Sequence, residues 1–231
     1  MEYERNLKYY KSNDKHFIVG MIVLGVGILL FAIGNVFGFR MFREQTSVAM
    51  TIMGIGAAIV YFPAMKRSDE GEIDNAVLRA TDRYDEEVAK NVNITLWHRM
   101  KPVLLGDFDF DGEGVLVRRG LKDRKYRSSE YVASALLFTK DGIYISQKRF
   151  SLVEDKTVES DMEFDFEYID EVYSVQEERV FGEKDVAKVC FLVIKEDGVE
   201  KARIPAKYNA VLDKICDDIN NASAEAKGIK K

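Results

Sequence analysis

The chain has 231 residues and a formal net charge of −5 at pH 7, and 47% of its residues are hydrophobic, enough for a globular core. Residues 1–65 hold six Lys/Arg against four Asp/Glu, so the overall −5 leaves a net charge of −7 for residues 66–231. An acidic soluble part argues against nucleic acid as the main partner, because phosphate binding requires a basic face.

Two uncharged apolar runs lie near the start of the chain, at Phe17–Phe39 and Ser47–Met65. At about 1.5 Å per helical residue the first run reaches roughly 34 Å, more than the hydrocarbon core of about 30 Å. The segment at 40–46 contains several charged residues and is too short to form anything but a turn between the two runs. The runs therefore predict two transmembrane helices in a hairpin. A cleaved signal peptide is the alternative for the first run, which is too long for one and lacks a cleavage site.

The charged flanks of these runs predict their orientation. Positive residues precede the first run and follow the second, whereas the turn between them holds only Arg40 and Arg43. The positive-inside rule then places both termini, and with them the tail at 1–16, in the cytoplasm. The chain is thus expected to be a multi-pass protein of the cell membrane. Cys190 and Cys216 have no disulfide-like spacing, which suits a reducing compartment.

Small residues recur four positions apart in both apolar runs. Such a stripe allows close helix packing, either between the two runs or in a homo-oligomer. The predicted helix-packing residues are Gly34, Gly38, Gly54 and Ala58.

Residues 66–98 read as an amphipathic linker helix. Apolar residues recur every three or four positions from Ile73 to Val92, and Ser68 and Asp69 are suitable N-cap residues. Pro102 marks the change to another pattern.

From Val103 onward the period of apolar residues changes to two, which predicts strands. The domain at 99–222 should be an all-β barrel or sandwich with a C-terminal capping helix that begins at Pro205, followed by a tail at 223–231. The expected hairpins join 103–110 to 114–119, 131–139 to 143–146, and 186–195 to 199–204.

Three segments in this domain carry a resemblance to a known family: LLFTKDGIYIS at Leu136–Ser146, FEYIDEVYSV at Phe166–Val175, and the late EDG turn at Glu196–Gly198. With the final amphipathic helix they make the chain similar to the pleckstrin-homology (PH) superfold over Leu104–Ala222. The nearest variants are GRAM-like and bacterial PH-like domains beside membrane spans. The resemblance implies a binding or regulatory module, although the polar stretch 118–130 departs from the pattern and leaves the early strand order open.

The densest positive run of the acidic domain lies in that polar stretch. It places six cations in ten residues: Arg118, Arg119, Lys122, Arg124, Lys125 and Arg127. The resemblance implies an anionic ligand or lipid headgroup here, and near an anionic leaflet each cation contributes about 1 kcal/mol. The alternative is a solvated loop balanced by Asp123 and other acids.

The run D-F-D-F-D-G at Asp107–Gly112 fits the opening of a calcium loop. Its twelfth position is Arg118, where a bidentate glutamate is required. A strand with Phe108 and Phe110 facing a core and the aspartates facing water accounts for the run as well. The chain shows no catalytic motif and only two histidines, so no catalytic residue, metal or cofactor is predicted.

These observations predict an integral membrane protein that presents a PH-like domain at the inner leaflet, where it recognises anionic headgroups or a protein partner. The alternative is a membrane effector whose β-barrel senses a small, nucleotide-like anion and signals through oligomerising helices.

Overall fold

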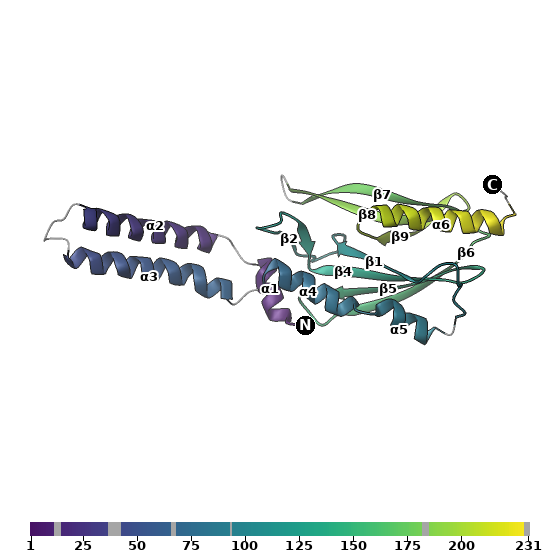
Figure 1. The fold of residues 1–231 in the computed structure, drawn as a ribbon, viewed down its shortest axis with the longest axis horizontal. Coiled ribbons are helices and arrows are strands. Elements are labelled where there is room, and N and C mark those ends of the chain that lie inside the picture. Colours follow the sequence, from purple (N-terminus) through teal and green to yellow (C-terminus); the bar gives the residue numbers. More distant parts are fainter. Residues whose placement is uncertain (12–14, 37–42, 66–67, 93, 182–184, 229–231) are drawn as a thin grey trace. The chain divides into compact units, whose positions relative to one another are not determined.

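The computed structural model describes residues 1–11, 15–36, 43–65, 68–92, 94–181 and 185–228 (Figure 1). Internal contacts divide the chain into two units: a helical unit, Glu2–Ile73, and a β-domain, Asp74–Lys231 together with Met1. Within the described ranges, six helices accompany nine strands in three sheets.

The helical unit begins with α1 (Tyr3–Lys11), where the sequence indicated only a tail. Asn6, Tyr9 and Tyr10 are buried, which accounts for a helix this short. Ser68 Oγ donates to Asn6 Oδ1 over 2.8 Å, so the start of the chain is fixed to the segment that follows α3.

Helices α2 (Lys15–Val36) and α3 (Arg43–Met65) pack through glycines other than the predicted helix-packing residues. A Cβ on Gly56 would lie 2.6 Å from Leu24 N, and one on Gly27 would lie 2.9 Å from Met53 N. Gly54, in contrast, has open space around it, and Ala58 is only partly buried. The predicted packing position Gly38 lies outside the described residues, and the surroundings of Gly34 are likewise outside them.

No helix in the described part of the chain has the length and apolarity needed to cross a membrane. The predicted spans at 17–39 and 47–65 are therefore wrong. The same finding contradicts the predictions that depend on these spans. These are an integral membrane protein that binds lipid at the inner leaflet, the alternative of a membrane effector, and a location in the cell membrane with both termini in the cytoplasm.

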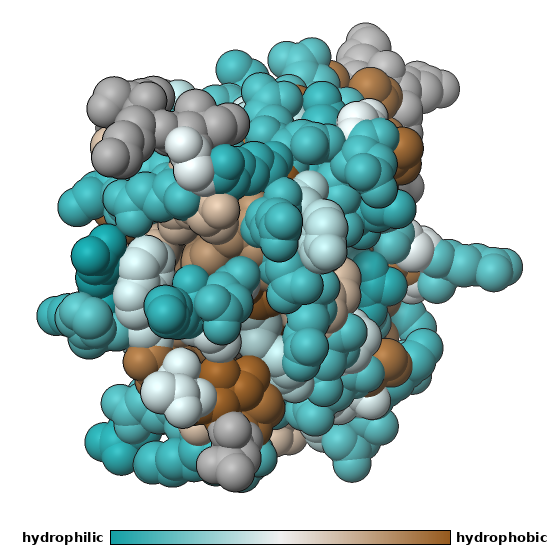
Figure 2. Space-filling view, turned by 90° about the vertical axis from the view of Figure 1, so that its right-hand side faces the viewer, coloured by the Kyte–Doolittle hydropathy of each residue, from teal (hydrophilic) through white to brown (hydrophobic). Residues whose placement is uncertain are grey.

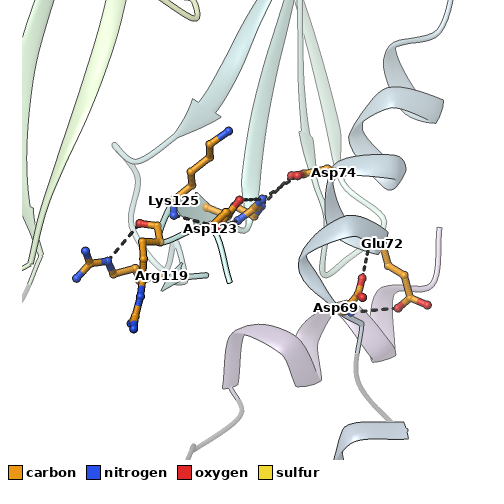
Figure 3. A network of polar contacts seen from close by, with 8 residues as sticks. Asp69, Glu72, Asp74, Arg119, Asp123 and Lys125 are labelled. Carbon is orange, nitrogen blue, oxygen red and sulfur yellow. Dashed lines mark hydrogen bonds and ion pairs between the residues drawn. The ribbon is translucent and has the colours of Figure 1, made fainter. Parts of the chain in front are cut away.

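The predicted linker helix at 66–98 is two helices, α4 (Glu70–Thr81) and α5 (Tyr84–Asn91). The break lies at Arg83, whose φ of 57° is left-handed and ends helical geometry. Asp69 and Glu72 form a capping box in which Glu72 N donates to Asp69 Oδ1 over 2.8 Å and Asp69 N donates to Glu72 Oε2 over 3.2 Å (Figure 3). The predicted N-cap is thus confirmed.

The first sheet has the antiparallel order β1-β4-β5-β6. Its strands are β1 (Val103–Asp109), β4 (Glu130–Phe138), β5 (Gly142–Ser151) and β6 (Thr157–Asp165). In β4 every residue after Glu130 is buried, because one face meets the core and α5 packs against the strand. Tyr84 of α5 is hydrogen-bonded through its hydroxyl to Ser146 Oγ of β5 at 3.0 Å. The predicted hairpin of β4 and β5 is confirmed.

Between β1 and β4 the chain forms a separate hairpin, β2 (Val117–Arg119) with β3 (Tyr126–Ser128). The expected pairing of 103–110 with 114–119 is wrong, because β1 pairs with β4 instead. A short turn at Asp111-Gly112 favoured the local pairing, whereas β1 buries more surface beside the apolar strand β4.

The second sheet consists of β7 (Ile169–Phe181), β8 (Asp185–Glu196) and β9 (Val199–Pro205). The expected turn between β8 and β9 is confirmed, with positive φ at Asp197 and Gly198. Pro205 ends β9 and does not begin a helix. Instead α6 (Ala210–Ala226) begins after Asn209, whose Oδ1 accepts from Leu212 N over 2.9 Å.

The core lies between the two large sheets and α6 (Figure 1). Fully buried side chains come from all three layers: Leu136, Phe138, Ile145, Leu192, Ile194, Ile204 and Leu212. Asn220 of α6 pairs with both backbone groups of Val172 at 2.7 Å, so the helix covers the edge strand β7. Because α4, α5 and α6 accompany the strands, the fold is mixed α/β, and the predicted combination of a membrane hairpin with an all-β domain is wrong.

Candidate functional site

The β2–β3 hairpin presents the predicted basic run in a defined geometry. Arg119 lies opposite Tyr126 in the ladder, and Gly120 N donates to Lys125 O over 2.8 Å to close the tip. Arg124 adopts a φ of 59°, and Asp123 Oδ1 accepts from Lys125 N over 3.0 Å. The tip is therefore an ordered turn held by several hydrogen bonds.

Arg127, the sixth predicted site residue, points inward. Its side chain is 3% exposed and donates two hydrogen bonds to Asp74 of α4, at 2.8 and 2.7 Å. It donates two more to Asp123 at the hairpin tip, at 3.2 and 2.7 Å (Figure 3). These bonds hold the pKa of Asp123 at about 2, well below its usual range. Arg127 is thus a structural residue and is not available to a ligand.

The other five cations lie on the hairpin, four of them exposed and Arg118 partly buried. Arg119 is held most firmly: its Nε donates to Arg124 O over 3.2 Å, and its guanidinium lies 5.4 Å from the centre of the Tyr126 ring. Within the described ranges, Arg119, Arg124 and Lys125 have no carboxylate partner.

Aromatic side chains that the sequence did not single out lie beside these cations. The rings of Tyr126 and Phe181 are 6.1 Å apart, and those of Phe181 and Phe110 are 5.2 Å apart. Tyr126 could have been noticed in the sequence, because it stands between Lys125 and Arg127. Phe110 and Phe181 are distant in the sequence, and only the fold brings them to the hairpin. Together they form an aromatic base at the foot of the hairpin.

Of the three aspartates in the D-x-D-x-D-G run, Asp111 is exposed to water as expected, whereas Asp107 is partly buried and Asp109 is buried. Asp109 is buried and paired with Arg149, and Asp111 Oδ2 lies 3.1 Å from Arg179 Nη2. Burial raises the pKa of the partly buried Asp107 carboxyl. The described residues contain no group of three or more His, Cys, Asp or Glu side chains placed to hold a metal ion. Two of the aspartates, Asp109 and Asp111, form ion pairs with arginines instead.

No family model, curated protein or solved structure matches the chain. Its function must therefore be inferred from its own residues. Two cations of β5 have partners away from the hairpin: Lys148 lies 5.6 Å from the centre of the Tyr84 ring, and Arg149 pairs with Asp109.

A groove of about 580 Å³ separates α6 from the segment before β1. Its floor includes Trp97, Met100 and Ile215, and the ion pair between Arg99 and Glu225, 3.2 Å long, lies at its margin. Figure 2 looks onto the end of the molecule where α6 finishes and shows apolar surface in a hollow among hydrophilic side chains. The charged residues of its lining carry both signs, in contrast to the hairpin: Arg99, Lys101, Lys214, Asp218 and Glu225.

Proposed function

We propose that the β-domain is a binding module whose β2–β3 hairpin takes a phosphate-bearing anion. The observation that carries this proposal is the position of Asp123, the one carboxylate in the hairpin sequence. It is paired with the buried Arg127 and also attracts Lys125, but within the described residues it forms no ion pair with Arg119 or Arg124. The hairpin therefore presents concentrated positive charge in a domain that is acidic as a whole.

The arrangement of the strands supports the same proposal. The chain closes its last sheet with an amphipathic helix, α6, which is one feature on which the resemblance to the PH superfold is based. The hairpin is inserted in the connection from β1 to β4, the first two strands of the first sheet. Loops between early strands are where that resemblance places anion binding.

The hairpin is suited to phosphate by the preorganisation of Arg119. Its guanidinium is held by Arg124 O and by the Tyr126 ring, so less side-chain entropy is lost when it binds. A guanidinium donates two parallel hydrogen bonds to phosphate, and a lysine adds a compact charge. Arg119 would orient the anion, while Arg124 and Lys125 add attraction that salt weakens.

The test is a titration of the full chain with inositol hexakisphosphate, measured by calorimetry at two salt concentrations. The variant replaces Arg119, Arg124 and Lys125 with serine. The control replaces Lys140, Lys201 and Lys214, also exposed, with serine, so the net charge changes equally. We expect the hairpin variant to lose at least about tenfold in affinity and the control to lose less than about threefold.

A second arm separates phosphate from other anions. Citrate is compared with inositol hexakisphosphate under the same conditions, and tighter binding of the phosphate supports the proposal. Equal affinities of the two triple variants, or no binding by the unmodified chain, would refute the proposal.

A further inference from the structure

A second cavity lies between the two large sheets and is lined by three arginines; we name it the arginine cleft. It has a volume of about 350 Å³. Its lining consists of Asp109, Asp111, Val132, Gln147, Arg149, Val158, Ser160, Arg179, Phe191, Arg203 and Pro205. We infer that the arginine cleft binds a small organic oxyanion, a carboxylate or phosphate monoester on a short apolar body.

The arginines reach the arginine cleft from three strands. Arg149 stands on β5, Arg179 on β7 and Arg203 on β9, so both sheets contribute. Arg203 lies 4.7 Å from the centre of the Phe191 ring, which fixes its guanidinium against one wall. Since a guanidinium binds either carboxylate or phosphate through two parallel bonds, three of them in one cavity favour an oxyanion.

The charge in the arginine cleft is not balanced by its own lining. Three guanidinium groups face two carboxylates there, those of Asp109 and Asp111. Glu177, outside the lining, is shared: its Oε2 lies 3.1 Å from Arg179 Nη1, and its Oε1 accepts from Arg203. With Glu177 included, three carboxylates balance the three arginines, so no carboxylate is left for a metal cation. Each guanidinium carries five N–H donors, more than these ion pairs use, and the remaining donors favour an anion.

One donor at the arginine cleft is left without a partner. Arg179 Nε is buried and makes no hydrogen bond within the described residues, although both terminal nitrogens of this guanidinium are paired. A buried donor without an acceptor costs about 1–3 kcal/mol. This nitrogen has almost no exposed surface, so a ligand would instead contact the terminal nitrogens of the three guanidinium groups.

The other lining residues of the arginine cleft indicate the chemistry of the rest of the ligand. Val132, Val158, Phe191 and Pro205 are apolar, and Gln147 and Ser160 add neutral hydrogen-bonding groups. The volume lies near the lower end of the range for ligand pockets. An inorganic ion would leave the apolar walls unfilled, whereas a compact body with one anionic group would contact both kinds of wall.

The inference does not depend on the hairpin. The hairpin cations Arg119, Arg124 and Lys125 are absent from the lining, so each site can be removed without touching the other. The test titrates the full chain with phenyl phosphate, benzoate and inorganic phosphate by calorimetry. We expect phenyl phosphate or benzoate to bind at least about tenfold more tightly than inorganic phosphate.

Two variants remove the site in different ways. Arg203→Gln takes away one guanidinium while Glu177 keeps its pairing with Arg179, so no carboxylate is left alone. Val158→Asp adds a negative charge to the wall without breaking an ion pair, and because Val158 is 54% exposed the fold should tolerate it. Each variant should bind the aromatic probe at least about tenfold more weakly than the unmodified chain.

Matched controls separate this site from the hairpin. Val199→Asp changes a residue that is 56% exposed and outside the arginine cleft, and Arg119→Gln weakens only the hairpin. Both should bind the aromatic probes normally. If no probe binds, or if Val158→Asp and Arg203→Gln bind as tightly as the unmodified chain, the arginine cluster serves only to join the two sheets and the inference is wrong.

Discussion

At the scale of single residues, Arg127 joins three parts of the β-domain. It stands on β3 and donates to Asp74 on α4 and to Asp123 at the hairpin tip. An arginine guanidinium stays charged, so Arg127 favours the ionised form of Asp123 and lowers the pKa of that carboxyl. Without Arg127, two negative groups would face each other and the tip would lose its anchor.

We expect Arg127→Gln to lower the stability of the β-domain by about 2–3 kcal/mol. The loss should be below that of a fully buried ion pair, because the Asp74 side chain is 47% exposed and can be hydrated. Urea unfolding can be followed through Trp97, which packs on the buried Phe166 with ring centroids 6.1 Å apart. The control, Arg119→Gln, should change stability by less than about 0.5 kcal/mol. Equal midpoints would contradict the structural role of Arg127.

The same ion pair predicts a pH dependence. The pKa of Asp123 is about 2 in the folded chain and ordinarily 3.8, so the folded state favours the ionised carboxyl. Its stabilisation is present in full above about pH 4 and is lost as the pH falls toward 2. The unfolding midpoint of Asp123→Asn should therefore lie below that of the unmodified chain at pH 7, and the difference should shrink between pH 4 and 3. A difference that stays constant over this range would contradict the pairing.

At the scale of elements, the contact between α2 and α3 depends on glycines that lack a Cβ. Gly56 allows the backbone of Leu24 to approach, and any side chain there would collide with it. Gly54 lies two residues away, on the opposite side of the helix, where space is open. The packing face is thus defined by backbone proximity and not by residue size alone.

Gly56→Val should therefore separate the two helices, whereas Gly54→Val should be tolerated. The full chain can be compared in a mild detergent that covers exposed apolar side chains such as Ile22 and Leu29. Circular dichroism at 222 nm during heating should show an earlier loss of helix for Gly56→Val alone. If both variants melt together with the unmodified chain, the close approach of α2 and α3 does not stabilise them.

Local signals in the sequence predicted the elements well. The turn before Gly142, the Asp197-Gly198 turn and the capping box of Asp69 and Glu72 depend only on neighbouring residues, and all three are present. The pairing of β1 with β4 and the break at Arg83 depend on distant packing, so the period of apolar residues did not reveal them.

The candidate sites also differ in whether neighbouring residues reveal them or only the fold does. The five hairpin cations outside the core were visible as charge density along the chain. The inward role of Arg127 depends on Asp74, which is 53 positions earlier in the sequence. The arginines of the cleft stand on β5, β7 and β9, and only the folded sheets bring them together.

At the scale of the whole molecule, the joint between the second sheet and α6 contains both cysteines. Cys190 of β8 and Cys216 of α6 are buried in the core, and burial raises the pKa of the Cys216 thiol to about 12. A thiol that stays protonated and buried does not react with disulfide reagents. Exposure of these thiols would require α6 to leave the sheet.

We expect both thiols to resist Ellman's reagent in the native chain and to react within seconds in urea. The rate in the native state should follow the opening of α6, so Asn220→Ala, which removes its two bonds to Val172, should raise it several-fold. A cysteine placed at Lys140, an exposed position, is the control for an accessible thiol. Rapid reaction of the native chain would mean that α6 is not held as the core contacts indicate.

The boundary between the two units falls inside a helix, because α4 spans Glu70–Thr81 and the β-domain begins at Asp74. Within the β-domain, the hydrogen bonds of Arg127 link Asp74 on α4 to Asp123 at the hairpin tip. A substitution that removes the Asp74 carboxylate would therefore loosen the hairpin tip at a distance, although within the described part of the chain Asp74 contacts none of the exposed cations there.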